Sequence, residues 1–161
     1  MPSPKRTFLD RELAHLVKHA YANAPAVKRI FDDAGVKPTD IKRVADLARV
    51  PVTPKDRLIQ MQRESPPFGG FLAADPQRLK HIYLSPGPLF EPQGADRALD
   101  QVAAEIFRIA GFKRGEIALN TLSYHLSPGG WLLEGGLQRA GVCVVPGGVG
   151  NTELQVRTRS E

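Results

Sequence analysis

The stretch from Lys80 to Gly94 most constrains what this chain can fold into. It contains a short apolar strand over residues 81–84, a turn of Ser85, Pro86, Gly87 and Pro88, and then a helical pattern that opens near Ala95. A strand, a loop with glycine and proline, and a helix form the layout in which many α/β proteins hold a phosphate. We therefore expect the first strand of an α/β domain here, followed by a candidate phosphate loop.

Helical and strand patterns alternate after residue 94. Apolar spacing predicts helices over residues 95–110 and 129–140, and strands over residues 116–121 and 142–145. Both strands are apolar without alternation, which is typical of parallel strands buried on both faces. Together with the strand at residues 81–84, they predict a three-stranded parallel βαβαβ unit. Cys143 lies in the last apolar run, so we expect a buried, inert thiol there.

The N-terminal half has helical patterns and no strands. Apolar stripes predict helices over residues 9–21 and 27–34, separated by Pro25, and a further helix that starts near Thr53 and Pro54. The Ser/Pro/Gly-rich stretch at residues 65–70 is the best boundary candidate. The fold class expected is α/β, with a helical N-terminal subdomain over residues 1–66 and an incomplete α/β subdomain over residues 67–161.

A loop and the start of another helix close the sequence, so the predicted sheet is small and open-edged. Such a sheet is typical of a part of a larger domain, because an unpaired edge and an uncovered apolar face invite association. We therefore expect exposed apolar surface around Val142, Val144 and Leu154, marginal stability and a tendency to self-associate.

Composition excludes several classes of protein. The single cysteine among 161 residues rules out a disulfide framework and a multi-cysteine metal site. His15 and His19 lie one helical turn apart without a third ligand nearby, so no metal site is expected. No apolar run is long enough to span a membrane and no signal peptide opens the chain, so a soluble, cytoplasmic protein is expected.

The net charge of +5 belongs to the N-terminal half. Residues 1–80 contain 15 Lys and Arg against 9 Asp and Glu, whereas residues 81–161 contain 7 against 8. The basic residues are spread singly, and no aromatic residues interleave with them. A solvated helix face is therefore the better interpretation, and no nucleic-acid surface is expected.

Several phrases, in this order, resemble the phenylacetate–CoA ligase branch of the AMP-forming acyl-CoA ligases, part of the adenylate-forming superfamily. They are LAHLVKHAY at residues 13–21, FDDAGV at residues 31–36, LARVPVTPKD at residues 47–56, PFG at residues 67–69, PGG at residues 128–130 and GG followed by NTE at residues 147–153. The resemblance covers nearly the whole chain. It implies the N-terminal portion of such a ligase, within the large N-terminal domain of adenylate-forming enzymes.

In these ligases the loop after the first strand reads Ser-Ser-Gly-Thr-Thr-Gly-Lys-Pro and embraces the ATP phosphates. Of the matching residues 85–92, only Ser85, Gly87 and Pro92 agree with that pattern, and Glu91 stands at the lysine position. The resemblance therefore implies Ser85 and Gly87 as remnants of a degenerate phosphate loop. Because prolines remove N–H donors and a carboxylate repels phosphate, we expect very weak ATP binding.

A second site-like stretch spans residues 120–130. Tyr124 falls on a tyrosine of the family pattern that lines the aromatic acid pocket, and the resemblance extends this substrate-binding role to Gly129 and Gly130. An equally open interpretation is structural, with Tyr124 covering the end of the sheet and His125 exposed. His125 replaces a glycine of the pattern, so no catalytic role follows for it, and no other catalytic residue is expected.

The resemblance also implies what the parent chemistry requires. Such a ligase joins a small aromatic or aliphatic carboxylic acid to CoA, with ATP and Mg²⁺ as cofactors, and releases AMP and pyrophosphate. Its adenylate motif, ribose-binding aspartate and C-terminal lysine would lie beyond residue 161. We therefore expect a truncated ligase that is inactive alone and binds neither ATP nor CoA tightly.

Two other classes stay open beside this one. A non-catalytic binding or interaction module could keep the ligase fold after losing the ATP loop. A nucleotide-binding Rossmann domain is disfavoured, because no G-x-G-x-x-G follows any predicted strand.

Overall fold

The structure is a computed structural model that describes residues 4–95 and 98–160, and it divides into two compact units. The first unit contains the chain up to His81 together with Pro86–Gly94. The second contains Ile82–Ser85 together with the chain from Ala95 onward. The subdomain boundary expected after residue 66 remains a prediction.

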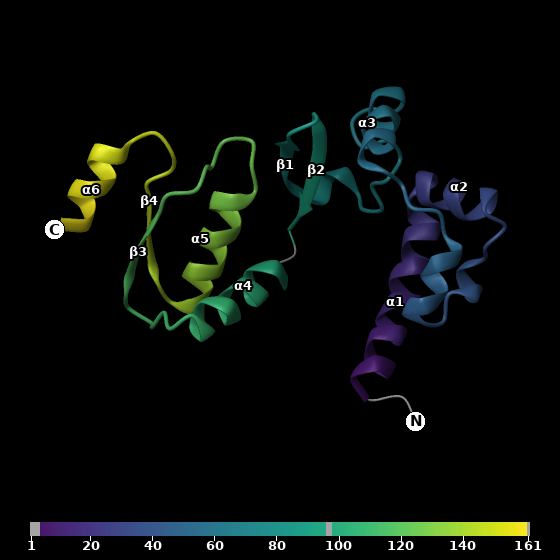
Figure 1. The fold of residues 1–161 in the computed structure, drawn as a ribbon, viewed down its shortest axis with the longest axis horizontal. Helices are drawn as coiled ribbons and strands as arrows, with labels where there is room; N and C mark the ends of the chain where they lie inside the picture. The colour runs from purple at the N-terminus through teal and green to yellow at the C-terminus, as the bar shows by residue number, and fades with distance from the viewer. Residues whose placement is uncertain (1–3, 96–97, 161) are drawn as a thin grey trace. The chain divides into compact units, whose positions relative to one another are not determined.

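The first unit is mainly helical (Figure 1). Pro25 separates its first two helices, because proline lacks the N–H that would continue the first helix and instead fits the first turn of the second. In chain order, the α-helices and 3₁₀ helices (η) are α1 (Pro4–Asn23), α2 (Pro25–Asp33), η1 (Pro38–Asp40), η2 (Val44–Arg49), α3 (Lys55–Glu64) and η3 (Pro76–Arg78).

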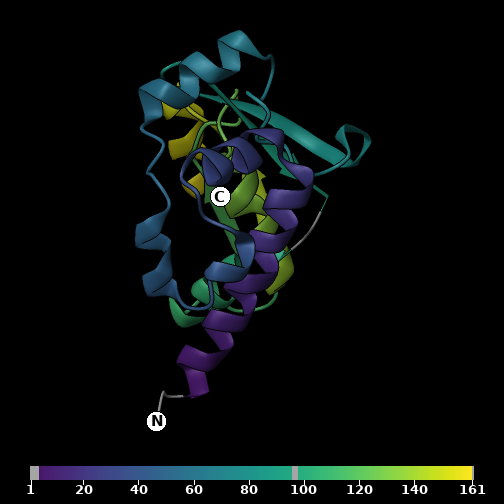
Figure 2. The same ribbon diagram turned by 90° about the vertical axis from the view of Figure 1, so that its right-hand side faces the viewer.

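A small apolar core holds these N-terminal helices together. Its buried members are Val17, Phe31, Val36 and Ile41, and α1 packs beside η1 and η2, as Figure 2 shows. The stretch over residues 65–70 is packed rather than loose, because the Ala26 N–H donates to the Gly70 carbonyl at 3.0 Å. The helix predicted to start near Thr53 is α3, but no side chain caps it, and Pro54 occupies the cap position.

The strand predicted over residues 81–84 is β1 (Leu79–Ser85), and its partner is β2 (Leu89–Gly94). The link between them is only three residues, Pro86–Pro88. Parallel strands need a much longer crossover, so β1 and β2 form a hairpin. The first predicted strand therefore lies in a two-stranded sheet of its own, not in the sheet of the later strands. The segment expected to be an open phosphate loop forms half of this hairpin.

The second unit contains the expected parallel strands. Its elements after the hairpin are α4 (Ala98–Ile109), β3 (Ile117–Asn120), α5 (Gly129–Ala140), β4 (Cys143–Pro146) and α6 (Thr152–Ser160). β3 and β4 pair in parallel, with Ile117 opposite Cys143 and Asn120 opposite Pro146. The α/β class is therefore confirmed. The helix predicted from residue 95 is described from Ala98, because residues 96 and 97 lie outside the described residues.

Helix α5 covers one face of this sheet and packs against α4 (Figure 1). The two helices approach closely at Gly136, where a Cβ atom would lie only 2.5 Å from the Cβ of Ala103. The core behind them contains four buried residues: Ala104, Leu137, Ala140 and Val142. Ala118 and Val144, from the strands, pack against this core.

The opposite face of the sheet is partly open. Ile117 and Cys143, which lie opposite each other in the register, are both exposed. The expectation of a buried Cys143 is therefore wrong, because its strand is covered on one face only at this position. The expectation that Val142 is exposed is also wrong, since Val142 packs into the helix-covered core. Leu154 on α6 is exposed, as expected, whereas Val144 is half-buried.

A second apolar surface lies on α4. Four aliphatic side chains, spaced three or four residues apart, are each more than half exposed: Leu99, Val102, Ile106 and Ile109. We call them the α4 stripe. No helix in the described part of the chain is long and apolar enough to cross a membrane.

Candidate functional site

Helix α3 holds the hairpin turn through two side chains that lie two helical turns apart. The Lys55 ammonium donates to the Pro86 carbonyl at 2.6 Å. The Gln62 amide donates to the Phe90 carbonyl and accepts from the Phe90 N–H, each at 2.8 Å. Gln62 is buried, so the backbone of Phe90 is paired as it would be with a neighbouring strand.

Gly87 lies at the tip of the turn and packs against α3. Its φ of 147° falls in the region that favours glycine, and a Cβ atom would lie 3.0 Å from Cδ1 of Ile59. Gly87 is therefore required by the shape of the turn, whether or not a phosphate ever lies there.

The turn offers few donors to a phosphate. Pro86, Pro88 and Pro92 have no N–H, and the Phe90 N–H is taken by Gln62. Glu91, at the position of the family's lysine, is half-buried and lines a mainly apolar cavity of about 500 Å³. These residues fit a triphosphate poorly, because backbone donors are missing or occupied, the Lys55 ammonium already donates to the Pro86 carbonyl, and Glu91 adds a negative charge.

Ser85 ends β1. Its hydroxyl oxygen is buried and has no hydrogen-bond partner among the described residues. The preceding residue, Leu84, donates its N–H to the Leu126 carbonyl at 2.7 Å, which ties this end of β1 to the loop after β3.

Asn120, at the end of β3, is the centre of the second candidate site. It is 5% exposed, and its side-chain amide donates to the Tyr124 hydroxyl at 2.8 Å and to the Gly130 carbonyl at 2.9 Å. Its amide oxygen accepts from the Leu122 N–H at 3.1 Å. One buried side chain thus fixes both the loop after β3 and the start of α5.

Tyr124 lies in that loop with its phenol held between two partners. The hydroxyl accepts from Asn120, and the Glu134 carboxylate is close enough to influence its ionisation. Burial, followed by the neighbouring Glu134 carboxylate, raises the pKa of the Tyr124 phenol to about 12. The phenol is therefore neutral at physiological pH and presents no charge to an anionic ligand.

Trp131 completes an aromatic pair with Tyr124. Their ring centroids lie 5.3 Å apart in an edge-to-face arrangement, and the indole N–H donates to the Tyr124 carbonyl at 3.0 Å. Trp131 is 41% exposed, so part of its ring remains open to a ligand.

Gly129 and Gly130 begin α5 and differ sharply in their surroundings. A Cβ atom on Gly129 would meet its nearest neighbours at 3.6 Å, an ordinary contact. A Cβ atom on Gly130 would lie 2.6 Å from the Ser123 carbonyl oxygen and 2.9 Å from Cγ of Tyr124. Gly130 therefore lets the Tyr124 loop lie directly on the helix start, and its N–H donates to that same carbonyl at 2.9 Å.

Asn120, Glu134 and Trp131 were not among the site residues expected from the sequence. A signal was available for Asn120, since an amide at the end of an apolar strand needs a buried partner. His125, for which no catalytic role was expected, is exposed and beside the network. In the described part of the chain no group of three metal-ligating side chains occurs.

Comparisons with known proteins assign this chain to a family. The sequence is 33% identical over 147 residues to a phenylacetate–coenzyme A ligase of Aromatoleum evansii, and the match covers 88% of this chain and 32% of that protein. It is 32% identical over 157 residues to a phenylacetate–coenzyme A ligase of Thermus thermophilus, covering 94% and 34% respectively. This chain is related to the phenylacetate–CoA ligases. No family model matches the sequence.

A solved structure supports the relationship. The fold superposes on 2-hydroxyisobutyryl-CoA ligase, solved in the postadenylation state with 2-HIB-AMP, with a TM-score of 0.89 and 26% identity. The match covers 99% of this chain and 35% of that protein. The resemblance to an N-terminal portion of an adenylate-forming CoA ligase is therefore confirmed, and the chain spans about a third of the length of the relatives that it matches.

Proposed function

We propose that this chain is the N-terminal part of an AMP-forming acid–CoA ligase and supplies one wall of its carboxylic-acid pocket. The parent reaction would join a carboxylic acid and CoA with ATP, giving acyl-CoA, AMP and pyrophosphate. The observation that carries this proposal is the Asn120 network, which holds Tyr124 and the start of α5 in one arrangement. Tyr124, Gly129 and Gly130 are the proposed substrate-binding residues.

The substrate class proposed is a small carboxylic acid with an aromatic or compact aliphatic group. Tyr124 and Trp131 offer ring surfaces in an edge-to-face pair, which suits a planar or apolar acyl group. The neutral Tyr124 phenol can approach a carboxylate without repelling it. The relatives' name, phenylacetate–coenzyme A ligase, supports an aromatic acid.

ATP with Mg²⁺ and CoA are the proposed cofactors of the parent enzyme, not tight ligands of this chain. The Lys55 and Gln62 contacts hold the turn closed as a hairpin, and Pro86 and Pro88 remove N–H donors from it. The proposed location is the cytoplasm, where CoA ligases find ATP and CoA.

A second candidate function is a non-catalytic binding module. The observation that favours it is the turn itself, where Glu91 stands at the lysine position and the Phe90 N–H is used internally. In this case the acid pocket would be retained and adenylate formation lost.

Trp131 allows a direct test of acid binding, because it is the only tryptophan in the chain. We expect its fluorescence to change saturably when phenylacetate is added to the isolated chain, and Tyr124→Ala to abolish that change. His125→Ala is the matched control, because His125 is an exposed neighbour in the same loop. A fluorescence change that survives Tyr124→Ala would refute the pocket assignment.

The two candidate functions differ in what a repaired loop would do. In a longer chain carrying the remaining ligase elements, Ser or Thr at positions 86, 88 and 89 and Lys at position 91 should restore ATP turnover if the loop decayed from an enzyme. Absence of turnover, with acid binding intact, would favour the binding module.

A further inference from the structure

We propose that a basic-rimmed groove in the first unit docks an acidic amphipathic helix of a partner protein. The groove lies between α1 and the segment of residues 37–42, and we call it the lysine groove. It is independent of the proposed ligase function.

The lysine groove is long and has an apolar floor. It follows α1 from Asp10 to Ala22, which at about 1.5 Å per residue is roughly 18 Å, or just over three helical turns. Its volume is about 1000 Å³, and Ala14, Ala22 and Pro38 are among the apolar residues that line it. A groove of this kind accepts the apolar face of a helix of three to four turns.

Positive charge rims this apolar floor from both sides. Lys18 comes from α1, whereas Lys37 and Lys42 come from the opposite segment. Among the described residues, the ammonium groups of these three lysines form no ion pair. Asp10 is the single carboxylate of the lining, and one of its oxygens accepts from the Val44 N–H at 3.1 Å.

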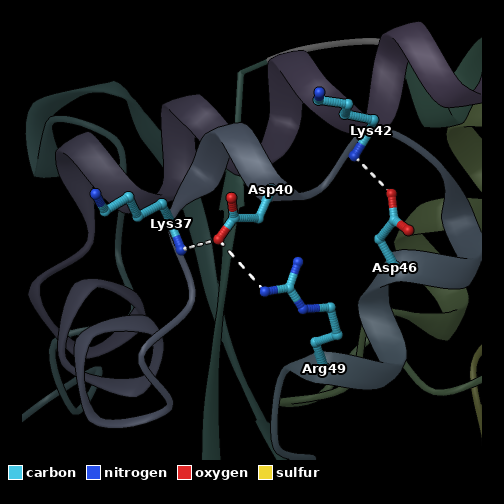
Figure 3. A network of polar contacts seen from close by, with 5 residues as sticks. All are labelled: Lys37, Asp40, Lys42, Asp46 and Arg49. Carbon is cyan, nitrogen blue, oxygen red and sulfur yellow. Dashed lines mark hydrogen bonds and ion pairs between the residues drawn. The ribbon is translucent and has the colours of Figure 1, made fainter.

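The nearby acidic side chains accept hydrogen bonds from backbone N–H groups (Figure 3). Asp40 accepts from the Lys37 N–H at 3.0 Å and lies 3.5 Å from the Arg49 guanidinium. Asp46 accepts from the Lys42 N–H at 2.9 Å.

The lysine ammonium groups are therefore not neutralised by these two acids. In Figure 3 the side chains of Lys37 and Lys42 extend away from Asp40 and Asp46. The backbone hydrogen bonds from Lys42 and Arg43 also lower the pKa of Asp46, which keeps its carboxylate charged and in place. The local acids thus shape the segment and leave three cations for a partner.

A helix with several carboxylates suits this arrangement better than other anions. A small anion could meet one or two of the lysines, whereas carboxylates on both flanks of a helix can meet lysines on both walls. The volume also lies at the upper end of the range for small-molecule pockets. The excess of basic residues in the N-terminal half would draw an acidic partner toward this surface.

The test uses a synthetic peptide of about 15 residues, with leucines at helical i, i+3, i+4 and i+7 spacing and glutamates on both flanks. We expect the full chain to bind it in a fluorescence-anisotropy titration and to bind a scrambled peptide of the same composition much more weakly. The variant Lys18→Glu, Lys37→Glu, Lys42→Glu should weaken binding at least about tenfold. Raising the salt concentration should also weaken binding by the full chain.

The matched control is Arg63→Glu, Arg78→Glu, Lys80→Glu. It makes the same change in charge at exposed positions of the same unit that do not line the groove. We expect it to keep the peptide affinity within about twofold. Circular dichroism melts establish that each triple variant is folded. If the groove variant does not fold, Lys37→Glu and Lys42→Glu are tested as single substitutions.

Three results would overturn the proposal. The full chain could fail to bind the amphipathic peptide, or the control variant could lose as much affinity as the groove variant. Stronger binding to phosphatidylglycerol vesicles than to the peptide would assign the groove to a lipid surface instead.

Discussion

The side-chain amide of Gln62 pairs with both backbone groups of Phe90, at 2.8 Å each. Replacing Gln62 by Leu should therefore remove the hydrogen-bond partner of the Phe90 N–H and of the Phe90 carbonyl. We expect the free energy of unfolding to fall by roughly 1–3 kcal/mol. Urea denaturation followed by circular dichroism measures the loss, and amide hydrogen exchange at Phe90 should quicken. Gln60→Leu, at an exposed position of the same helix, is the control. Equal stability of the two variants would contradict the role given to Gln62.

Adjacent glycines at the start of α5 should respond oppositely to one methyl group. Gly129→Ala should leave stability within about 1 kcal/mol of the original protein, because its Cβ has room. Gly130→Ala should cost about 1–3 kcal/mol and displace the Tyr124 loop, because its Cβ would collide with the backbone of Ser123. Thermal unfolding and the near-ultraviolet circular dichroism of the Tyr124–Trp131 pair report both effects. Equal stability of the two variants would contradict the close approach of Gly130 to the backbone of Ser123.

The ionisation of Tyr124 should depend on Glu134. The phenol has a pKa of about 12 in the folded protein, against an ordinary value of 10.0. Its contribution to stability is present below about pH 10 and is lost as the pH rises toward 12, because only the unfolded state releases the proton in that interval.

Glu134→Gln should lower the pKa of Tyr124, since it removes a negative charge beside the phenol. Absorbance at the tyrosinate band, taken as the difference from Tyr124→Phe, isolates this residue from Tyr21 and Tyr83. Asn120→Ala should move the pKa the other way, because the Asn120 hydrogen bond lowers it. A pKa of Tyr124 that is unchanged in Glu134→Gln would rule out this influence of Glu134 on the phenol.

The α4 stripe should drive self-association. Val102→Lys together with Ile106→Lys should shift sedimentation profiles toward monomer and change the free energy of unfolding by no more than about 0.5 kcal/mol, because both side chains are well exposed. Gln101→Lys with Ala110→Lys adds the same charge at exposed positions outside the stripe, so it should leave association nearly unchanged. A purely charge-driven effect would appear equally in both pairs.

Cys143 should react as an accessible thiol. It is exposed on the open face of the β3–β4 pair, opposite Ile117. A thiol-specific chromogenic reagent should modify it in the folded protein at a rate close to that in denaturant. Complete protection in the folded protein would mean that this face is covered, for example by a second copy of the chain.

The sequence predicted the elements of the second unit well, because their signals are local. Residues 129–140 carry a helical stripe that ends at Gly141, and α5 has these bounds. The strands at residues 117–120 and 143–146 are short apolar runs between helical stripes. Patterns of this kind do not depend on what lies elsewhere in the chain.

Features that depend on partners were harder to predict. β2 contains Pro92 and Glu91 and reads as a loop, yet it forms a strand because Gln62 and β1 pair with it. Cys143 lies in an apolar run, but burial depends on what covers each face, which an apolar pattern alone does not specify. The same reasoning applies to Asn120, whose importance comes from Gly130 and Tyr124 meeting at its side chain.

Lys55 and Gln62 of α3 form hydrogen bonds only to main-chain atoms of the hairpin. These atoms are the carbonyl of Pro86 and the N–H and carbonyl of Phe90. The path of the turn is thus set by another element and places few demands on the exposed side chains of Pro88 and Phe90. Such a segment can accumulate substitutions during evolution without unfolding, which explains how a loop can drift away from a nucleotide-binding sequence while the surrounding fold is kept. The same freedom makes it a convenient place to graft a new recognition sequence.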